Sequence, residues 1–219
     1  MQGWRKTMED TYIANTTSLG DGIYIFSVFD GHGGSEVSKY LKLNFSNFLK
    51  ENENFKAGKY ELALVQTFRE IDKSFIKTEI NKKLKSFSQE PIGAWDKPGV
   101  KGVAYSVGST ACMALITPKT IFVANLGDSR CIISMNGKPY EMSVDHKPEL
   151  DSEKKRIIAA GGFIKDNRVK GMLNLSRSFG DMNYKCDEEL SPKKQMVISI
   201  PEICEQPRTK DIDFLLIAC

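Results

Sequence analysis

The chain has 219 residues, of which 41% are hydrophobic and 27% are charged, and its formal net charge is +3. This length and composition are typical of a globular domain, and the small net charge argues against a dedicated nucleic-acid-binding protein. No apolar run reaches the roughly 20 residues that span a bilayer, and the first ten residues lack the apolar core of a signal peptide.

The first part of the chain predicts two strands followed by two helices. Residues 11–17 and 22–29 are expected to be the strands, the second of which is rich in aromatic and β-branched residues. Apolar residues recur at helical spacing over residues 35–51 and again over residues 59–83, so both helices are expected to pack on a sheet. The apolar face of the second helix is expected to contain Leu62, Val65, Phe68, Ile71, Phe75 and Ile76.

The rest of the chain predicts mainly short strands. Residues 85–107 mix proline, glycine and serine without a period and are expected to form a loop. A helix is expected near residues 149–160, ending at Gly161-Gly162, and a hairpin turn is expected at Asn136-Gly137. The strand-like segments are residues 109–117, 120–127, 130–137, 138–144, 196–200 and 213–218. This order of elements predicts an α+β fold with layers of sheet and helix.

Acidic residues stand at the ends of several predicted strands. Glu9 and Asp10 precede the first strand, Asp30 ends the second, and Asp128 follows a later one. Each alone is typical of a turn or a helix cap. Because adjacent strands bring their ends together, we expect these carboxylates to converge, and a divalent cation would offset their repulsion. Oxygen ligands favour magnesium or manganese over zinc.

The chain has only two histidines, His32 and His146. Two imidazoles are too few for the usual binuclear iron or zinc sites, so an oxygen-ligand site that activates water for attack on phosphorus is favoured. His32 lies two residues after Asp30, so it is a candidate proton donor to a leaving oxygen, with a structural histidine as the alternative. We expect His146 to serve in capping or packing.

Three arginines are candidate phosphate ligands, because a planar guanidinium binds phosphate in a bidentate manner. Arg5 precedes Glu9 by four residues, whereas a surface or carboxylate-paired role is favoured for Arg130 and Arg177. The five cysteines are odd in number, and none forms a C-x-x-C pair. They predict a reducing compartment, expected to be the cytoplasm or the nucleus. No arginine stands six positions after a cysteine, which argues against a cysteine-nucleophile phosphatase loop.

Eight segments in a fixed order resemble the metal-dependent protein phosphatase family, the type 2C serine/threonine phosphatases. They are "MQGWRKTMED", "FDGHGG", "GSTA", "VANLGDSR", "DHKP", "EKKRIIAAGG", "RVKGMLNLSRSFGD" and "YK". The resemblance implies two packed antiparallel sheets flanked by helices, which is a four-layer α-β-β-α sandwich with a metal centre at one end. Its final elements are expected to be missing from residues 1–219.

The resemblance also implies a role for each acidic residue. Asp30 would bridge two Mg²⁺ or Mn²⁺ ions, and Gly31 would offer its backbone carbonyl to one of them. Glu9 and Asp10 would hold metal-bound waters from the second shell of ligands. Asp128 would contribute to a weaker third metal position.

The implied reaction is the hydrolysis of phosphoserine or phosphothreonine by metal-bound water, without a phosphoenzyme. Arg5 would bind the substrate phosphate, and His32 would be the general acid. Residues 182–195 would form a variable flap that bears on substrate choice. The protein is therefore expected to be a monomer that acts on phosphoproteins, with no nucleic-acid partner and no membrane segment.

The family pattern contains two further metal-binding aspartates, in D-G-x-W-D and D-N motifs, after a strand such as residues 213–218. Residues 1–219 are therefore expected to be a type 2C catalytic domain that ends before these motifs. If other residues occupy those places, a pseudophosphatase that binds phosphoproteins is the alternative. A hydrolase of small phosphate esters is a third hypothesis. Comparing hydrolysis rates on phosphopeptides and on free phosphate esters would distinguish it from a protein phosphatase.

Overall fold

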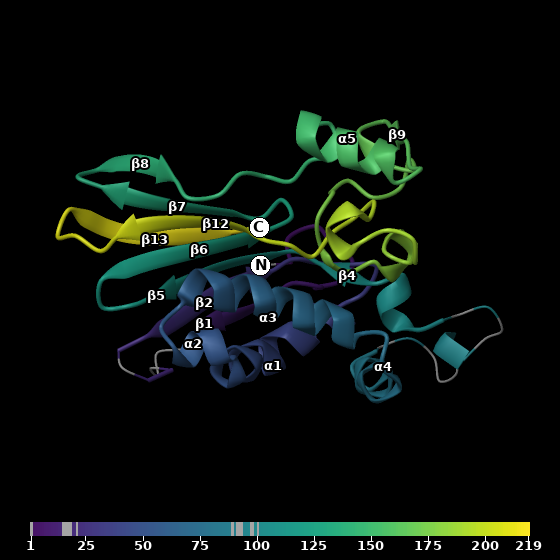
Figure 1. Ribbon diagram of the computed structural model, residues 1–219, viewed down its shortest axis with the longest axis horizontal. Coiled ribbons are helices and arrows are strands. Elements are labelled where there is room, and N and C mark those ends of the chain that lie inside the picture. The colour runs from purple at the N-terminus through teal and green to yellow at the C-terminus, as the bar shows by residue number, and fades with distance from the viewer. Residues whose placement is uncertain are drawn as a thin grey trace.

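A computed structural model describes residues 2–14, 19–20, 22–88, 90, 94–96, 99 and 101–219. Two antiparallel sheets pack face to face, and helices cover the free face of the larger one (Figure 1). The larger sheet has the strand order β1-β2-β5-β6-β12, and the smaller has the order β13-β7-β8. Their bounds are β1 Thr11–Ala14, β2 Tyr24–Phe29, β5 Ala111–Ile116, β6 Thr120–Leu126, β7 Arg130–Met135, β8 Lys138–Glu141, β12 Glu202–Pro207 and β13 Ile212–Ala218.

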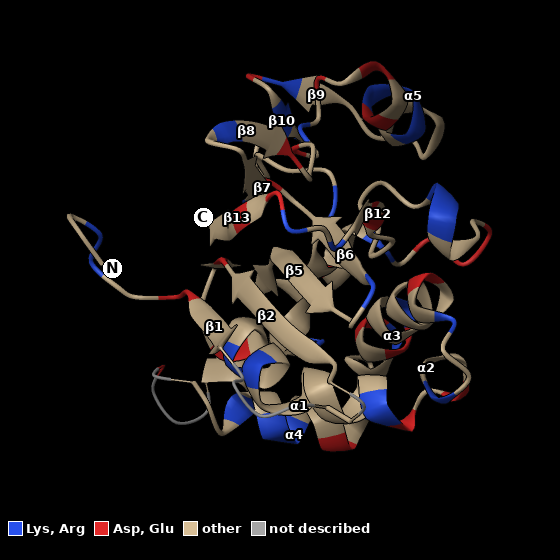
Figure 2. Ribbon diagram, turned by 90° about the vertical axis from the view of Figure 1, so that its left-hand side faces the viewer, with Lys and Arg blue, Asp and Glu red and all other residues tan. Residues whose placement is uncertain are grey.

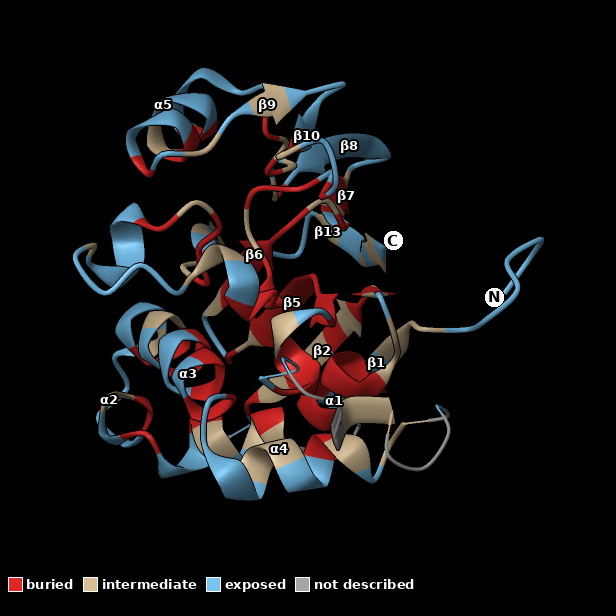
Figure 3. Cartoon of the chain, turned by 90° about the vertical axis from the view of Figure 1, so that its right-hand side faces the viewer, coloured by how far each residue is buried: buried red, intermediate tan, exposed pale blue. Residues whose placement is uncertain are grey.

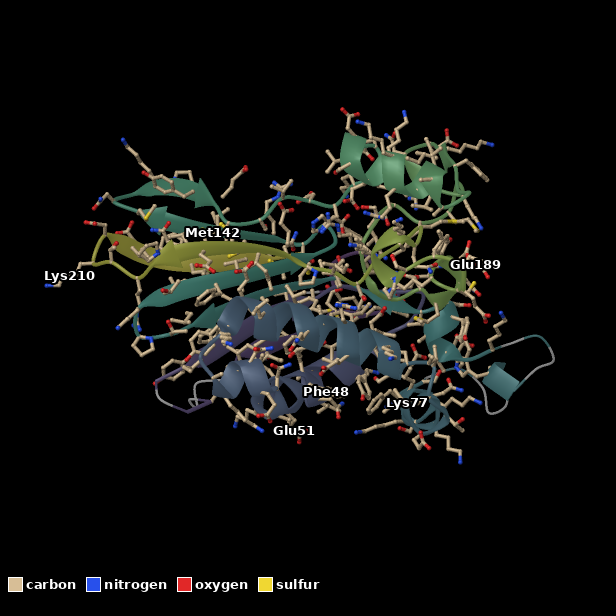
Figure 4. The ribbon with its side chains drawn as sticks, in the orientation of Figure 1. Phe48, Glu51, Lys77, Met142, Glu189 and Lys210 are labelled. Atoms are coloured by element: carbon tan, nitrogen blue, oxygen red, sulfur yellow. The ribbon has the colours of Figure 1, made fainter. Side chains whose placement is uncertain are left out.

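A small apolar cluster joins the two sheets. Its buried members come from strands of both sheets and from the residue after β8, and they are Cys112, Ala114, Ile121, Val123, Cys131, Ile133 and Met142. Met142, labelled in Figure 4, follows β8 and is 4% exposed. This packing confirms the predicted α+β class with two antiparallel sheets.

Helices form the layer on the other face of the larger sheet. Figure 3 shows that the buried residues concentrate where α1 and α3 meet β2 and β5. Within this layer, Phe45 of α1 packs edge-on against Phe68 of α3, with ring centroids 5.2 Å apart, and Phe68 stacks on Phe179 at 5.0 Å. The helices are α1 Glu36–Glu51, α2 Glu53–Lys56, α3 Tyr60–Ser74 and α4 Thr78–Lys85.

The predicted helix over residues 59–83 is wrong in one respect, because it is two helices. The first, α3, ends at Ser74, and Phe75 after it is buried against the ring of Phe179. Lys77 then takes an extended backbone conformation (ψ 139°), from which α4 starts. Ile76, which lies in this break, is exposed, and so is Leu62, which lies on the outer face of α3. The buried face of α3 instead contains Ala63, Leu64, Thr67, Phe68 and Ile71.

Several expectations for the other elements are confirmed. The helix near residues 149–160 is α5 (Asp151–Ala159), and the hairpin turn has positive φ at Asn136 (50°) and Gly137 (72°). The strand expected over residues 11–17 is described only as β1, because residues 15–17 lie outside the described residues. In the expected loop over 85–107, positions 89, 91–93, 97–98 and 100 also lie outside them. The rest of that loop includes 3-10 turns at η1 Ala94–Asp96 and η2 Val103–Tyr105.

The strand expected over residues 196–200 is wrong. That segment makes a single bridge, between Ile198 and Arg177, and its apolar side chains pack on the α5 region instead. The strand that does follow is β12, which pairs with β6 but is an edge strand with charged residues and a proline. Its weak apolar pattern explains why the sequence did not predict it.

Five short strands complete the chain: β3 (Gly31–His32), β4 (Gly108–Ser109), β9 (Ile164–Lys165), β10 (Arg168–Val169) and β11 (Phe179–Gly180). Two further 3-10 turns, η3 Met182–Tyr184 and η4 Pro192–Lys194, lie in the segment after β11. Figure 4 places Glu189 of this segment at the opposite end of the molecule from Lys210 in the β12–β13 turn.

The described residues provide three of the four predicted layers. None of them forms a helix over β13, where the side chains of Phe214 and Leu216 are exposed. The remaining helix, α5, lies beyond the ends of β7 and β8 (Figure 1). Within the described part of the chain, no helix is long and apolar enough to cross a membrane.

A buried carboxylate attaches α5 to the rest of the fold. Glu153 is 1% exposed and contacts Arg177 at 2.7 Å, Arg156 at 2.7 Å and the hydroxyl of Ser176 at 2.6 Å. Burial alone would raise the pKa of Glu153, but the two arginines and Ser176 lower it to about 2. The ionised carboxylate therefore stabilises the folded state.

We predict that Glu153→Gln lowers the free energy of unfolding by about 3 kcal/mol at pH 7, because it leaves two partly buried arginines without their carboxylate. The contribution is present above the ordinary pKa of 4.5 and is lost as the pH falls through 4.5 toward about 2. Urea unfolding across this pH range measures it. The exposed Glu149, changed to Gln, is the control, and equal stability of the two variants would contradict the prediction.

Candidate metal centre

One cleft of about 460 Å³ contains most of the site residues predicted from the sequence. It lies where the segment before β1 meets the ends of β2 and β13. Figure 2 shows the N-terminal segment reaching away from the sheets, with acidic residues at its base. The cleft is lined by Gln2, Arg5, Thr7, Met8, Glu9, Asp10, Asp30, Gly31 and Cys219.

The carboxylates of Asp10 and Asp30 are close together in this cleft. One ligand atom of each, with the sulfur of Cys219, lies within 4.8 Å of the others. Burial and the neighbouring charges of Asp10 and Asp128 raise the pKa of Asp30 to about 6. Burial, Asp10 and Asp30 likewise raise the pKa of Cys219 to about 11. The site thus concentrates negative charge, which a hard divalent cation with oxygen ligands would neutralise.

The backbone of Asp30 is fixed by two hydrogen bonds to Thr110. The Asp30 amide donates to the Thr110 hydroxyl at 3.1 Å, and the Thr110 amide donates to the Asp30 carbonyl at 2.9 Å. The Thr110 hydroxyl also bonds to that of Ser129 at 2.7 Å. These contacts tie the end of β2 to the loop that carries Asp128.

Glu9 and Gly31 meet through their backbones. A Cβ atom on Gly31 would lie 2.3 Å from the carbonyl oxygen of Glu9, so no larger residue fits without displacing the segment that carries Asp10. The Glu9 carbonyl accepts a hydrogen bond from the hydroxyl of Ser38, and its carboxylate accepts one from the Gly34 amide at 3.4 Å. The glycines of the "DGHGG" segment therefore serve close packing as well as turning.

His32 lies beside the cleft and contacts a residue that the sequence reasoning missed. Its Nε2 is 2.7 Å from Oδ2 of Asp181, which also accepts a hydrogen bond from the hydroxyl of Ser178 at 2.6 Å. Burial alone would lower the pKa of His32, but the charges of Asp181, Asp30 and Asp128 raise it above the ordinary value. The only sequence signal for Asp181 was its place at the end of the "SRSFGD" segment.

Asp128 lies near the other carboxylates without joining their group within the described residues. Its carboxylate forms an ion pair with Lys147, although its charge still contributes to the raised pKa of Asp30. Arg5 lines the cleft from the exposed N-terminal segment. The structure therefore brings together Arg5, Glu9, Asp10, Asp30 and Gly31, with Asp128 paired to a lysine at their edge.

The remaining candidates have structural partners. Arg130 pairs with Asp145 at 3.0 Å, and Arg177 pairs with Glu153, as the carboxylate-paired interpretation predicted. His146 is 2% exposed, and its Nδ1 accepts a hydrogen bond from the Gly127 amide at 3.1 Å. Burial, with Arg177 nearby, lowers its pKa to about 4, so this ring is neutral at pH 7. The packing role predicted for His146 is confirmed.

Comparisons with known proteins agree on one family. The model for "Protein phosphatase 2C" matches residues 1–219. The chain is 43% identical to a probable protein phosphatase 2C of Paramecium tetraurelia over all of its own length and 70% of that protein. It is 38% identical to one from Arabidopsis thaliana, covering 68% of it.

Solved structures show the same fold. The structure of a serine-threonine phosphatase 2C from Toxoplasma gondii matches with a TM-score of 0.72 and 19% identity, over 97% of this chain and 73% of that one. A sex-determining protein of C. elegans matches with a TM-score of 0.73 and 24% identity, over 98% of this chain and 48% of that one. At these identities the likeness establishes the fold.

We predict that Mn²⁺ raises the thermal unfolding midpoint of the chain, because a ligand that binds only the folded state stabilises it. Asp30→Asn should abolish this rise. Without metal, the Asp30→Asn variant should have a higher unfolding midpoint than the wild-type protein, because the substitution removes one of two carboxylates that repel each other. Scanning fluorimetry with and without MnCl₂ measures both effects. The exposed Asp211, changed to Asn, should keep the full rise, and a full rise in the Asp30 variant would refute the site.

Proposed function

The chain belongs to the protein phosphatase 2C family, and from that premise we propose that the cleft around Asp30 is where it dephosphorylates phosphoserine and phosphothreonine in protein substrates. The family's function is metal-dependent protein serine/threonine phosphatase activity. The observation that carries the assignment to this cleft is the meeting of Asp10, Asp30, Gly31 and Arg5 in one space of about 460 Å³.

The residues of the cleft fit Mg²⁺ or Mn²⁺. The donors that line it are mainly carboxylates, and burial together with the charges of Asp10 and Asp128 raises the pKa of Asp30. We propose two ions, held by Asp30 and the Gly31 carbonyl with Glu9 and Asp10 orienting their waters, and a weaker third at Asp128. When bound, such ions polarise the phosphate and lower the pKa of water to near neutrality.

Arg5 binds and orients the substrate phosphate in this proposal. Its guanidinium is carried on the exposed N-terminal segment, where it can reach a phosphate on a protein surface, and it lines the same cleft as the carboxylates. A planar guanidinium can hold two phosphate oxygens at once, which orients the phosphorus for attack.

His32 holds the proton that the leaving side-chain oxygen needs. Its raised pKa favours the protonated ring, and Asp181 accepts from Nε2. Nδ1 is then the atom that donates to the serine or threonine oxygen. Because an alkoxide is a poor leaving group, this proton transfer contributes to the rate directly.

We also propose that residues 1–219 belong to a single catalytic domain that acts as a monomer in the cytoplasm or nucleus. All five cysteines are free thiols, which supports a reducing compartment. The presence of two further metal-binding aspartates after Cys219 stays a prediction.

We predict Mn²⁺-dependent release of phosphate from a phosphothreonine peptide. Asp30→Asn should abolish it, and Arg5→Ala should raise KM by about tenfold or more, because it removes a charge-assisted contact to the phosphate. Steady-state kinetics with malachite-green detection measures both changes. The control is Arg208→Ala, whose arginine lies next to β12 and should leave KM unchanged. Undiminished activity of the Asp30 variant would contradict the assignment.

A further inference from the structure

A three-stranded sheet of two-residue strands carries His32 at its edge. The order is β11-β4-β3, so Gly108 of the middle strand stands opposite His32 on one side and Gly180 on the other. Asp181 follows β11 directly. The two side chains that form the His32–Asp181 contact therefore come from opposite edges of this sheet and meet over its middle strand.

Gly108 makes that meeting possible. A Cβ atom built on it would lie 2.3 Å from Oδ2 of Asp181 and 2.4 Å from Nε2 of His32. Any side chain at this position would occupy the space in which the two groups bond. The absence of a side chain here is thus a condition for the 2.7 Å contact.

The backbone of Asp181 takes an uncommon conformation. Its backbone is left-handed (φ 52°, ψ 37°), which is uncommon for a residue other than glycine. Three hydrogen bonds hold Asp181 and the residue before it. Its amide donates to the Val107 carbonyl at 3.2 Å, its carboxylate accepts from Ser178, and the amide of the preceding Gly180 donates to Oδ1 of Asp72 on α3 at 2.9 Å.

A buried ion pair supports this arrangement. Lys185 and Asp72 have side chains 5% and 6% exposed, and the lysine nitrogen lies 2.9 Å from both carboxylate oxygens. The same nitrogen donates to the Ser178 carbonyl at 2.7 Å. The pair thus contacts the chain at Ser178 and Gly180, just before Asp181, and Lys185 itself lies four residues after Asp181. A buried ion pair adds little stability over an apolar pair of similar volume, so stability alone does not account for this one.

We propose that Asp181 is a positioning residue that fixes the ring of His32, and that the buried Asp72–Lys185 pair holds Asp181 in place for this task. The inference rests on the proposed function, in which His32 protonates the leaving oxygen. It assigns a kinetic role to a helix and a segment that do not line the cleft.

The test compares two substrates whose leaving groups differ in their need for a proton. Threonine leaves a phosphopeptide as an alkoxide unless it is protonated, whereas p-nitrophenolate leaves p-nitrophenyl phosphate without help. Asp181→Asn and Lys185→Met should each lower kcat on the phosphothreonine peptide by about 10²-fold, because misplacing a reacting group costs that much. On the aryl phosphate, kcat should fall by less than about threefold, since no proton donor is needed there.

The ratio of the two kcat values, measured on one preparation with Mn²⁺, is independent of the fraction of folded protein. The control is Lys56→Met, which breaks an exposed ion pair with Glu53 and should leave the ratio unchanged. If Lys185→Met does not fold, the ratio measured for the isosteric Asp181→Asn tests the inference by itself. If the wild-type protein is active and Asp181→Asn has the same ratio as wild type, the inference about Asp181 is wrong and the proposed function is unaffected. Absence of Mn²⁺-dependent activity in the unchanged protein would overturn the proposed function instead.

Discussion

Repulsion between the carboxylates of Asp10 and Asp30 is the constraint on which the rest of this site depends. The antiparallel register pairs Thr11 of β1 with Phe29 of β2, so the residues just outside this pair must be neighbours. The fold thus creates an unfavourable contact at the end of the sandwich as soon as the two strands pair. A bound divalent cation would turn that contact into a favourable one, so the strand pairing that builds the sheet would also build the proposed metal centre.

Close approach of backbone segments is the second requirement of the site, and glycine meets it at two positions. Gly31 lies against the carbonyl of Glu9, which keeps the segment before β1 against the end of β2. Gly108 leaves the space in which His32 and Asp181 meet. In both places a methyl group would occupy the volume of a functional contact. Gly31 therefore serves the proposed metal ligands, and Gly108 serves the proposed proton donor.

Patterns among neighbouring residues predicted the elements that depend mainly on contacts close in sequence. The helical spacing of Val37, Leu41 and Phe45 identified α1. The acidic residues at strand ends predicted the meeting of Asp10 and Asp30, although Asp128 pairs with Lys147 instead. Asp181 was not identified, because it meets His32 across a separation of 149 residues through strands of only two residues. Strands that short have no periodicity for a sequence to show. The break after α3 was also missed, because it falls inside a run of apolar residues at helical spacing, where Phe75 packs edge-on against the distant Phe179.

The most direct test of the metal centre is an anomalous difference map from crystals of the protein grown with Mn²⁺. We expect manganese peaks in the cleft, in contact with the carboxylate of Asp30 and next to Asp10 and Gly31. Crystals of Asp30→Asn should lose these peaks. Manganese bound only elsewhere on the surface, with Asp10 and Asp30 in contact with protein groups alone, would contradict the proposed metal centre.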